Sequence, residues 1–197
     1  MKEVLGTITI VLAIIGHAPY IKDTFKGKTQ PHLFTWVIWS LVVSIAFLVQ
    51  WTNEGGAGSW GTGVTALLVI IIAVLSIRKG TGDITKLDKV LFVSALIAII
   101  PWYITKNPTV SIILISIIDA CAFLPTIRKT MNDPSSETLI TYVLNVARHG
   151  LSIIALSKLS FVTVLYPVYL LIMNIVMSTI ILRNKLTKEK VDNIKLG

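Results

Sequence analysis

The 197-residue chain contains one cysteine, three histidines and few charged residues, which make up 14% of the sequence. The single cysteine, Cys121, cannot form an intrachain disulfide bond, and no Cys/His spacing typical of a metal site is present. The sequence also lacks a glycine-rich phosphate loop and any set of a nucleophile with its base. These absences argue against an enzyme and against a bound cofactor or metal ion.

Acidic residues are scarce, since ten Asp and Glu stand against eighteen Lys and Arg, and the net charge is +8. In a soluble protein this excess could indicate nucleic-acid binding, but here the basic residues lie between long apolar runs. Hydrophobic residues make up 54% of the chain, and the mean hydropathy is +0.79. Few soluble domains of this size can bury so much apolar surface, so the composition predicts a protein whose partner is the lipid bilayer.

Seven apolar segments are candidates for transmembrane helices, which need about 20 residues each. Glycines at the start of the third segment, Gly61 and Gly63, and the loop 55–58 before it indicate close packing at that end. The predicted fold class is all-α, a polytopic membrane protein with seven transmembrane helices. The predicted segments are about 4–22, 32–51, 60–78, 87–105, 109–128, 137–156 and 161–183.

Part of the chain is repeated without a gap 106 residues later, so that residues 19–45 align with 125–151. Both copies contain an apolar run that ends in a proline, a short basic loop and a second apolar run. Any two membrane helices around a basic loop resemble each other to some degree, but here proline, loop length and polar positions all keep register. The identical pairs are Pro19/Pro125, Ile21/Ile127, Thr24/Thr130, Leu33/Leu139, Thr35/Thr141 and Val37/Val143.

This repeat predicts two triple-helix bundles joined by a linker helix. The extra crossing of the membrane is needed because parallel repeats of three helices must start on the same side. The predicted domains are a first repeat at 1–80, a linker helix at 81–106, a second repeat at 107–185 and a cytoplasmic tail at 186–197.

The basic residues lie almost entirely on one side of the predicted membrane domain. The side that holds Met1 carries Lys2, Lys106 and Lys158, whereas fourteen Lys and Arg lie on the other side and Arg148 lies within a helix. Basic loops stay in the cytoplasm, so the N-terminus is predicted to be outside and the C-terminus cytoplasmic. The compact loops and the lack of a targeting tail favour a plasma membrane.

With this order of helices the chain resembles the PQ-loop and SWEET superfamily of transporters over about residues 4–183. The resemblance rests on the 3+1+3 order and on Pro19 and Pro125, each near the cytoplasmic end of the first helix of a repeat. Gln30-Pro31 is a reversed variant of the motif that names the family, and the second copy has Ser136-Glu137 there instead. The resemblance implies a solute site near the middle of the membrane, with these three prolines as flexible points for gating.

Three polar residues of the second repeat lie at one level near the middle of the membrane. Measured from the cytoplasmic helix ends, Asp119 and Asn174 are about 13 Å deep and Arg148 about 16 Å deep. Ionisable groups at this depth are costly and mark functional sites. The least unfavourable arrangement pairs Asp119 with Arg148, either as a static lock or as a site that binds solute charge or exchanges a proton. Their counterparts in the first repeat, Ala13 and Val42, carry no charge.

Further candidates surround this level. His149 lies about 100° around the helix from Arg148, so at most one of the two is expected to point fully into a cavity. His149 suits proton coupling, although a packing role is the alternative. His17, about 7 Å deep, is a candidate gate at the cytoplasmic mouth. Trp39 and Asn145 are counterparts in the repeat, and the resemblance implies that residues of these types bind solute.

The sequence therefore predicts a carrier that moves a small polar solute by alternating access. Such a carrier is compatible with coupling to protons and with assembly as a homo-oligomer. Arg148 favours a carboxylate, so an amino acid or organic acid rivals a sugar. The repeat counterpart of Asn174 is the apolar Leu68, which argues against a symmetric sugar site. The alternatives are a ligand or sorting receptor that uses the same fold without transport, and a vitamin-precursor carrier with a similar helix count.

Overall fold

The computed structural model describes the backbone of residues 1–82, 84–105 and 107–196, with the side chains of all these residues except 91, 95, 98–103, 105 and 184–196. The predicted all-helical fold class is confirmed for this part of the chain, which contains no strand. Lys106, which the charge count includes, and Gly197, the last residue of the predicted tail, lie outside the described residues. The helices are α1 (Lys2–Phe25), α2 (Leu33–Thr52), η1 (Gly56–Ser59), α3 (Trp60–Lys79), α4 (Lys86–Thr105), α5 (Pro108–Asn132), η2 (Pro134–Ser136), α6 (Leu139–Ala155) and α7 (Phe161–Leu196).

Five helical stretches of the described chain are long and apolar enough to cross a membrane, which is compatible with an integral membrane protein. α6 is also apolar but shorter. α7 differs from the prediction because it continues as a helix to Leu196, well past the predicted end at residue 183. The residues beyond 183 include Leu, Lys and Glu, which are strong helix formers even outside a bilayer. The five stretches are Lys2–Phe25, Leu33–Thr52, Gly56–Lys79, Pro108–Asn132 and Phe161–Arg183.

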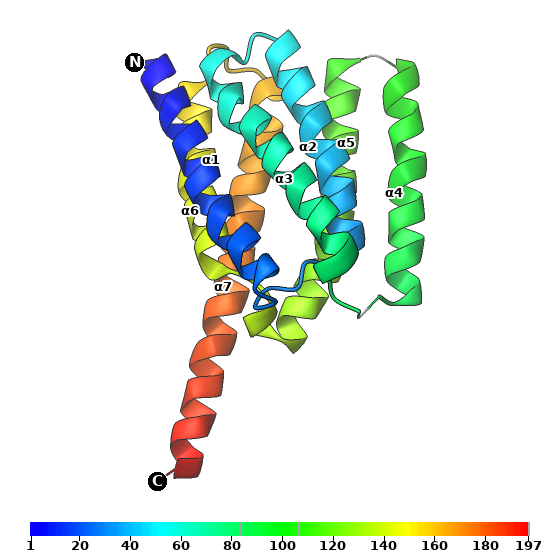
Figure 1. Ribbon diagram of the computed structural model, residues 1–197. Coiled ribbons are helices and arrows are strands. Elements are labelled where there is room, and N and C mark those ends of the chain that lie inside the picture. The colour runs from blue at the N-terminus through cyan, green and yellow to red at the C-terminus, as the bar shows by residue number, and fades with distance from the viewer. Residues whose placement is uncertain (83, 106, 197) are drawn as a thin grey trace.

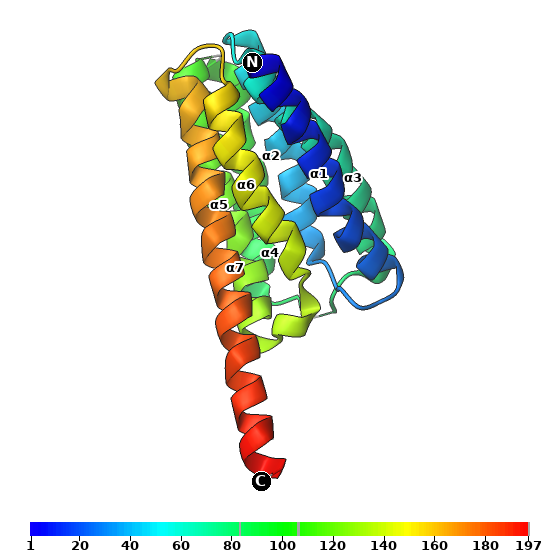
Figure 2. The ribbon, with the colours of Figure 1, turned by 90° about the vertical axis from the view of Figure 1, so that its left-hand side faces the viewer.

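Contacts between helices follow the same pattern in the two halves of the chain. α3 packs against both α1 and α2, and α7 packs against both α5 and α6 (Figures 1 and 2). The halves meet where α1 packs on α6 and where α2 packs on α5. α4 lies at the edge of the bundle, against α5 and α2 (Figure 1). The loops after α1, α3 and α5 lie together at one end, called the basic end below, and Met1 lies at the opposite end (Figure 1).

The polarity of the helices is that of a protein surrounded by lipid. Large apolar side chains point outward, and Leu67, Ile77 and Ile154 are each more than 60% exposed. Many buried hydroxyl groups donate to the carbonyl one turn earlier, as Thr65 does to Gly61 at 2.7 Å and Ser116 does to Ile112 at 2.7 Å. Such hydroxyls are satisfied within their own helix. Buried polar groups that bond to other helices, or have no partner, are therefore the ones to consider for a functional site.

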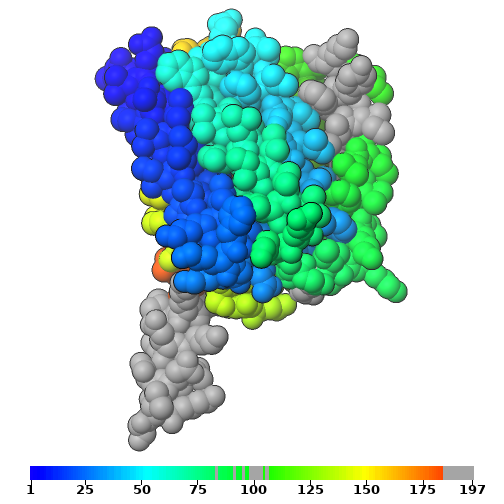
Figure 3. Space-filling model, in the orientation of Figure 1, coloured from blue at the N-terminus to red at the C-terminus, as the bar shows by residue number. Residues whose placement is uncertain are grey.

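The predicted close packing around the glycines of α3 is confirmed. A Cβ atom on Gly61 would lie 2.6 Å from Thr9 Oγ1 and 2.8 Å from Thr9 Cβ, and one on Gly63 would lie 2.8 Å from the Phe47 ring. Figure 3 shows α1 and α3 in continuous contact along this face. Small residues at such a crossing let two membrane helices approach each other closely.

Replacing Gly61 by alanine is expected to destabilise the protein by about 1–3 kcal/mol, because the added methyl group forces α1 and α3 apart. Gly150, in the middle of α6, is the matched control, since nothing lies within 4 Å of its missing Cβ. Gly150→Ala should leave stability unchanged or raise it by up to about 1 kcal/mol through helix propensity. Unfolding of both variants in detergent compares them, and equal stability would contradict the close contact.

Candidate functional site

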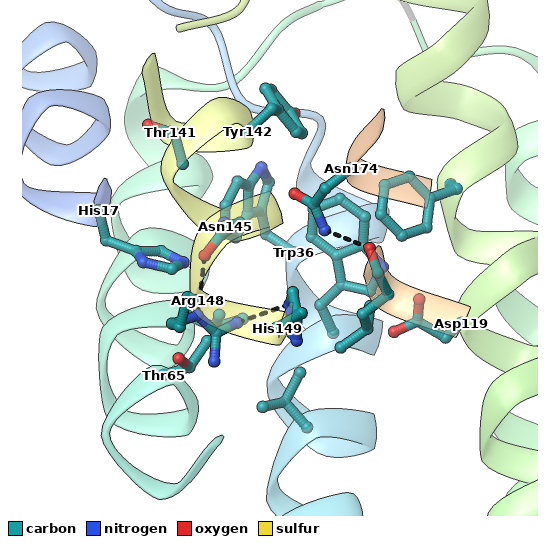
Figure 4. A pocket seen from close by; sticks show the side chains of 15 residues that line it. His17, Trp36, Thr65, Asp119, Thr141, Tyr142, Asn145, Arg148, His149 and Asn174 are labelled. Atoms are coloured by element: carbon teal, nitrogen blue, oxygen red, sulfur yellow. Dashed lines mark hydrogen bonds between the residues drawn. The ribbon is translucent and has the colours of Figure 1, made fainter. Parts of the chain in front are cut away.

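A cavity of about 50 Å³ lies between the two halves of the bundle, lined by residues near the middle of six helices (Figure 4). The structure brings together around it all six residues that the sequence predicts for solute binding, and His17 from α1 as well. These six come from α2, α5, α6 and α7. They are Trp39, Asp119, Asn145, Arg148, His149 and Asn174.

Asp119 does not form the expected ion pair with Arg148. Its carboxylate oxygens accept hydrogen bonds from the Tyr166 hydroxyl at 3.0 Å and the Tyr169 hydroxyl at 2.7 Å. The prediction placed Asp119 and Arg148 at similar depth, and both line the same cavity. Depth along a helix does not, however, determine which helices are neighbours. α7 packs against both α5 and α6 and supplies the two tyrosines, so Asp119 and Arg148 face the cavity from different sides (Figure 4).

Arg148 is buried and is held by its own helix. Its Nε donates to Asn145 Oδ1 at 2.9 Å and its Nη2 donates to His149 Nε2 at 2.8 Å (Figure 4). The third nitrogen, Nη1, has no partner among the described residues. Both Arg148 and His149 line the cavity, because the long arginine side chain bends back to the imidazole.

His17 was predicted as a gate at the cytoplasmic mouth, but it lies at the cavity itself. It is buried and lines the cavity, and its Nδ1 donates to the Ala13 carbonyl at 2.8 Å. On the other side, Asn174 donates from Nδ2 to the Leu170 carbonyl at 2.8 Å, which directs its amide group along α7 (Figure 4). Trp39 packs on Phe123 with ring centroids 4.4 Å apart, but its Nε1 has no partner.

Sequence reasoning missed the two tyrosines that hold Asp119. Tyr166 and Tyr169 are three residues apart, so they project from neighbouring positions on α7 toward the same acceptor. This spacing was visible in the sequence, but nothing in it indicated that α7 is the helix that faces Asp119. Thr141 was noted only as a repeat position, and the structure places its unpartnered hydroxyl at the cavity.

A second group of buried polar residues lies between the cavity and the basic end, and we call it the basic-end cluster. Its centre is Glu137, which forms an ion pair with Lys129. The same carboxylate accepts from the Tyr20 hydroxyl at 3.2 Å and from the Tyr142 hydroxyl at 2.9 Å. All four residues are buried, so the charges of the ion pair are shielded from water.

The basic-end cluster joins the two halves of the chain. Lys129 Nζ donates to the Gln30 carbonyl at 2.6 Å and to the Ser136 carbonyl at 3.3 Å. The hydroxyls of Thr29 and Thr138 lie 2.6 Å apart beside it. The contacts of Glu137 with Tyr20, of Lys129 with Gln30 and of Thr29 with Thr138 cross between the halves, so these three must break if the halves separate at this end.

The two copies of the repeat differ at the position of Glu137. In the alignment by 106 residues it takes the position of Pro31. The second copy therefore has a buried acceptor at this point instead of a proline. Sequence reasoning noted Glu137 as the start of a predicted helix and as part of the changed motif in the second copy. It assigned no functional role to Glu137, because a single acidic residue beside a basic loop is normally exposed.

The three prolines predicted as gating points lie toward the basic end and do not line the cavity. Pro19 and Pro125 lie inside α1 and α5, where each removes one backbone hydrogen bond from its helix. Pro31 precedes α2, and its carbonyl accepts from the Thr81 backbone at 3.0 Å. Their gating role stays a prediction.

Near the basic end, α4 is attached to the bundle through a buried carboxylate. Asp88 accepts from Arg128 Nη2 at 2.8 Å and from His32 Nε2 at 3.4 Å. Burial lowers the pKa of His32, so its ring is neutral near pH 7 and the charge of Asp88 is balanced by Arg128. The resulting contact holds α4 against α2 and α5.

The opposite end is closed by tight backbone packing. A Cβ atom on Gly58 would lie 2.7 Å from the Leu156 backbone nitrogen, and the Ser157 backbone donates to the Gly55 carbonyl at 3.2 Å. An exposed ion pair between Lys158 and Glu54, at 3.3 Å, lies outside this contact. Tight packing at this end and the basic-end cluster therefore lie on either side of the cavity along the bundle.

Within the described residues, no three His, Cys, Asp or Glu side chains are grouped so that they could hold a metal ion. Comparisons of the chain with protein-family models, with curated proteins and with solved structures gave no match. Any conclusion about function therefore rests on the geometry of the cavity and on the packing at its two ends.

Proposed function

We propose that the protein is a membrane carrier that moves a small polar solute by alternating access, with the central cavity as its solute site. The observation that carries this proposal is an internal cavity lined in part by buried ionisable and amide side chains, inside an otherwise apolar bundle. Asp119 and Arg148, which are 1% and 2% exposed, both line it. Ionisable groups inside a membrane protein are costly, and they mark solute or ion pathways when they face an internal cavity.

The pattern of helix contacts supports this function. The repeat makes α1 equivalent to α5, α2 to α6 and α3 to α7. When the two copies are exchanged, the contact of α1 with α6 corresponds to the contact of α5 with α2, and both contacts are present. Two triple-helix bundles around an approximate two-fold axis, with seven membrane crossings in all, would give this pattern. Carriers built from such repeats move one bundle against the other around a site between them.

The packing at the two ends supports a carrier in preference to an open channel. The basic-end cluster and the packing of Gly58 on Leu156 would each have to open in turn for a solute to pass. In this proposal the basic end is cytoplasmic, the N-terminus is outside, and the membrane is a plasma membrane. The arrangement is that of a carrier of the PQ-loop and SWEET kind.

Uptake into liposomes tests the proposal. Purified protein is expected to accumulate a labelled solute from a panel of sugars, amino acids and organic acids, with and without an inward proton gradient. Asn174→Ala should reduce uptake about tenfold, because a buried hydrogen bond to the solute contributes about 1.4 kcal/mol. Ile154→Ala, on the outer surface, is the control that should leave uptake unchanged.

A non-transporting receptor would behave differently in the same material. A ligand that binds the native state raises the midpoint of thermal unfolding whether or not it crosses the membrane. If a member of the panel raises this midpoint but shows no uptake above protein-free liposomes, the receptor function replaces the carrier function.

A further inference from the structure

The cavity contains hydrogen-bond donors that the protein itself leaves without an acceptor. Arg148 Nη1, Trp39 Nε1 and Thr141 Oγ1 are all buried, all belong to residues that line the cavity, and have no partner among the described residues. A buried donor without an acceptor costs about 1–3 kcal/mol, and more when it is charged. Three of them at one cavity indicate that an acceptor-rich group completes the site.

The guanidinium of Arg148 is arranged to receive a planar anion at its end. Asn145 occupies its Nε and His149 occupies one hydrogen of Nη2. Nη1 and one hydrogen of Nη2 remain, so the guanidinium keeps donors for the oxygens of a carboxylate. The amide and the imidazole hold the guanidinium in place without neutralising its charge.

The other side of the cavity carries the opposite charge. Asp119 accepts one hydrogen bond on each oxygen from Tyr166 and Tyr169, but a carboxylate has about four acceptor positions. No Lys, Arg or His nitrogen of the described residues lies within 4.0 Å of it. In its ionised form Asp119 therefore has both the free acceptor positions and the charge to hold a cation that donates hydrogen bonds.

From this arrangement we infer that the solute is a small amino acid in its zwitterionic form, with its carboxylate on Arg148 and its ammonium group on Asp119. A simple carboxylate would satisfy Arg148 and leave the charge of Asp119 unbalanced, and a neutral sugar would balance neither charge. The cavity of about 50 Å³ is small beside the roughly 150 Å³ that holds benzene, so it has to widen to admit even the smallest amino acids. This inference rests on the proposed function for the identity of the site, but binding can be measured without transport.

Binding of matched compounds to the detergent-purified protein tests the inference. Glycine, alanine and β-alanine are compared by titration calorimetry with acetate and propionate, which lack the ammonium group, with ethanolamine, which lacks the carboxylate, and with glucose. At least one amino acid is expected to bind about tenfold or more tightly than every compound that lacks one of its two charges. Equal binding of acetate or glucose, or no binding of any amino acid, overturns the inference.

Variants identify the groups that bind. Arg148→Gln is expected to raise the Kd of the amino acid at least about 30-fold. Thr141→Val keeps the shape of the side chain and should raise Kd about 3–10-fold. Because the Thr141 hydroxyl has no partner in the empty protein, this variant should not lower the thermal midpoint without ligand, so it remains informative if Arg148→Gln fails to fold. Ser152, a buried and unpartnered hydroxyl on the same helix that does not line the cavity, gives the control Ser152→Ala, which should leave Kd unchanged.

Binding and uptake together separate this inference from the proposed function. Amino acid binding that Thr141→Val weakens, without uptake, supports the zwitterion site and contradicts the carrier. Uptake of a sugar without amino acid binding supports the carrier and contradicts the zwitterion site. A Kd that neither Arg148→Gln nor Thr141→Val changes places the amino acid elsewhere and overturns the assignment.

Discussion

Glu137→Ala is expected to lower the free energy of unfolding by about 3–5 kcal/mol, because it removes one partner of a buried ion pair. Lys129 would keep only the carbonyls of Gln30 and Ser136, and its ammonium charge would have no counter-ion. The buried hydroxyls of Tyr20 and Tyr142 would also lose their acceptor. Thermal or denaturant unfolding in detergent, compared with the unmodified protein, measures the loss.

The exposed pair at the opposite end supplies the matched control. Glu54 and Lys158 lie 3.3 Å apart, but both side chains are more than half exposed, so Glu54→Ala should cost less than about 1 kcal/mol. The double variant Glu137→Leu with Lys129→Met should recover much of the stability, since it removes both buried charges together. If Glu137→Ala costs no more than Glu54→Ala, the basic-end cluster does not stabilise the closed end.

A disulfide bond across the basic end is expected to stop uptake completely. The Thr29 and Thr138 hydroxyls lie 2.6 Å apart and belong to the two halves of the chain, so Thr29→Cys with Thr138→Cys places two thiols in reach of each other. The native cysteine is replaced by Cys121→Ser in the same protein. Under oxidising conditions uptake into liposomes should fall to the protein-free level, because the basic end can no longer open.

Reduction of the same sample is the control for this experiment, and it should restore uptake. Amino acid binding should persist in the oxidised protein, since neither Thr29 nor Thr138 lines the cavity, which can still open toward the opposite end. Full uptake by the cross-linked protein would contradict the role of the basic-end cluster as a gate and would require the solute to leave by another route.

The sequence by itself indicated an all-helical chain, most of the helix positions and six of the residues that line the cavity. Apolar runs and their breaks define where helices begin and end, and the rise of about 1.5 Å per residue defines the depth of each polar group. For this reason Asp119, Arg148 and Asn174 were found together at one level, and Trp39 and Asn145 followed from the repeat. The glycines of α3 indicated close packing because a residue without a side chain lets another helix approach, which is a property of the residue itself.

Only the tertiary structure decided which groups at that level are partners. Depth along a helix says nothing about the order of helices around the bundle, so the sequence favoured an ion pair between Asp119 and Arg148 that the intervening α7 replaces with two tyrosines. The bonds of Arg148 to Asn145 and His149 depend on how its flexible side chain bends. The burial of the Glu137–Lys129 pair depends on the loop after α1, which contains Gln30. This loop meets the α5–α6 connection only in the folded bundle.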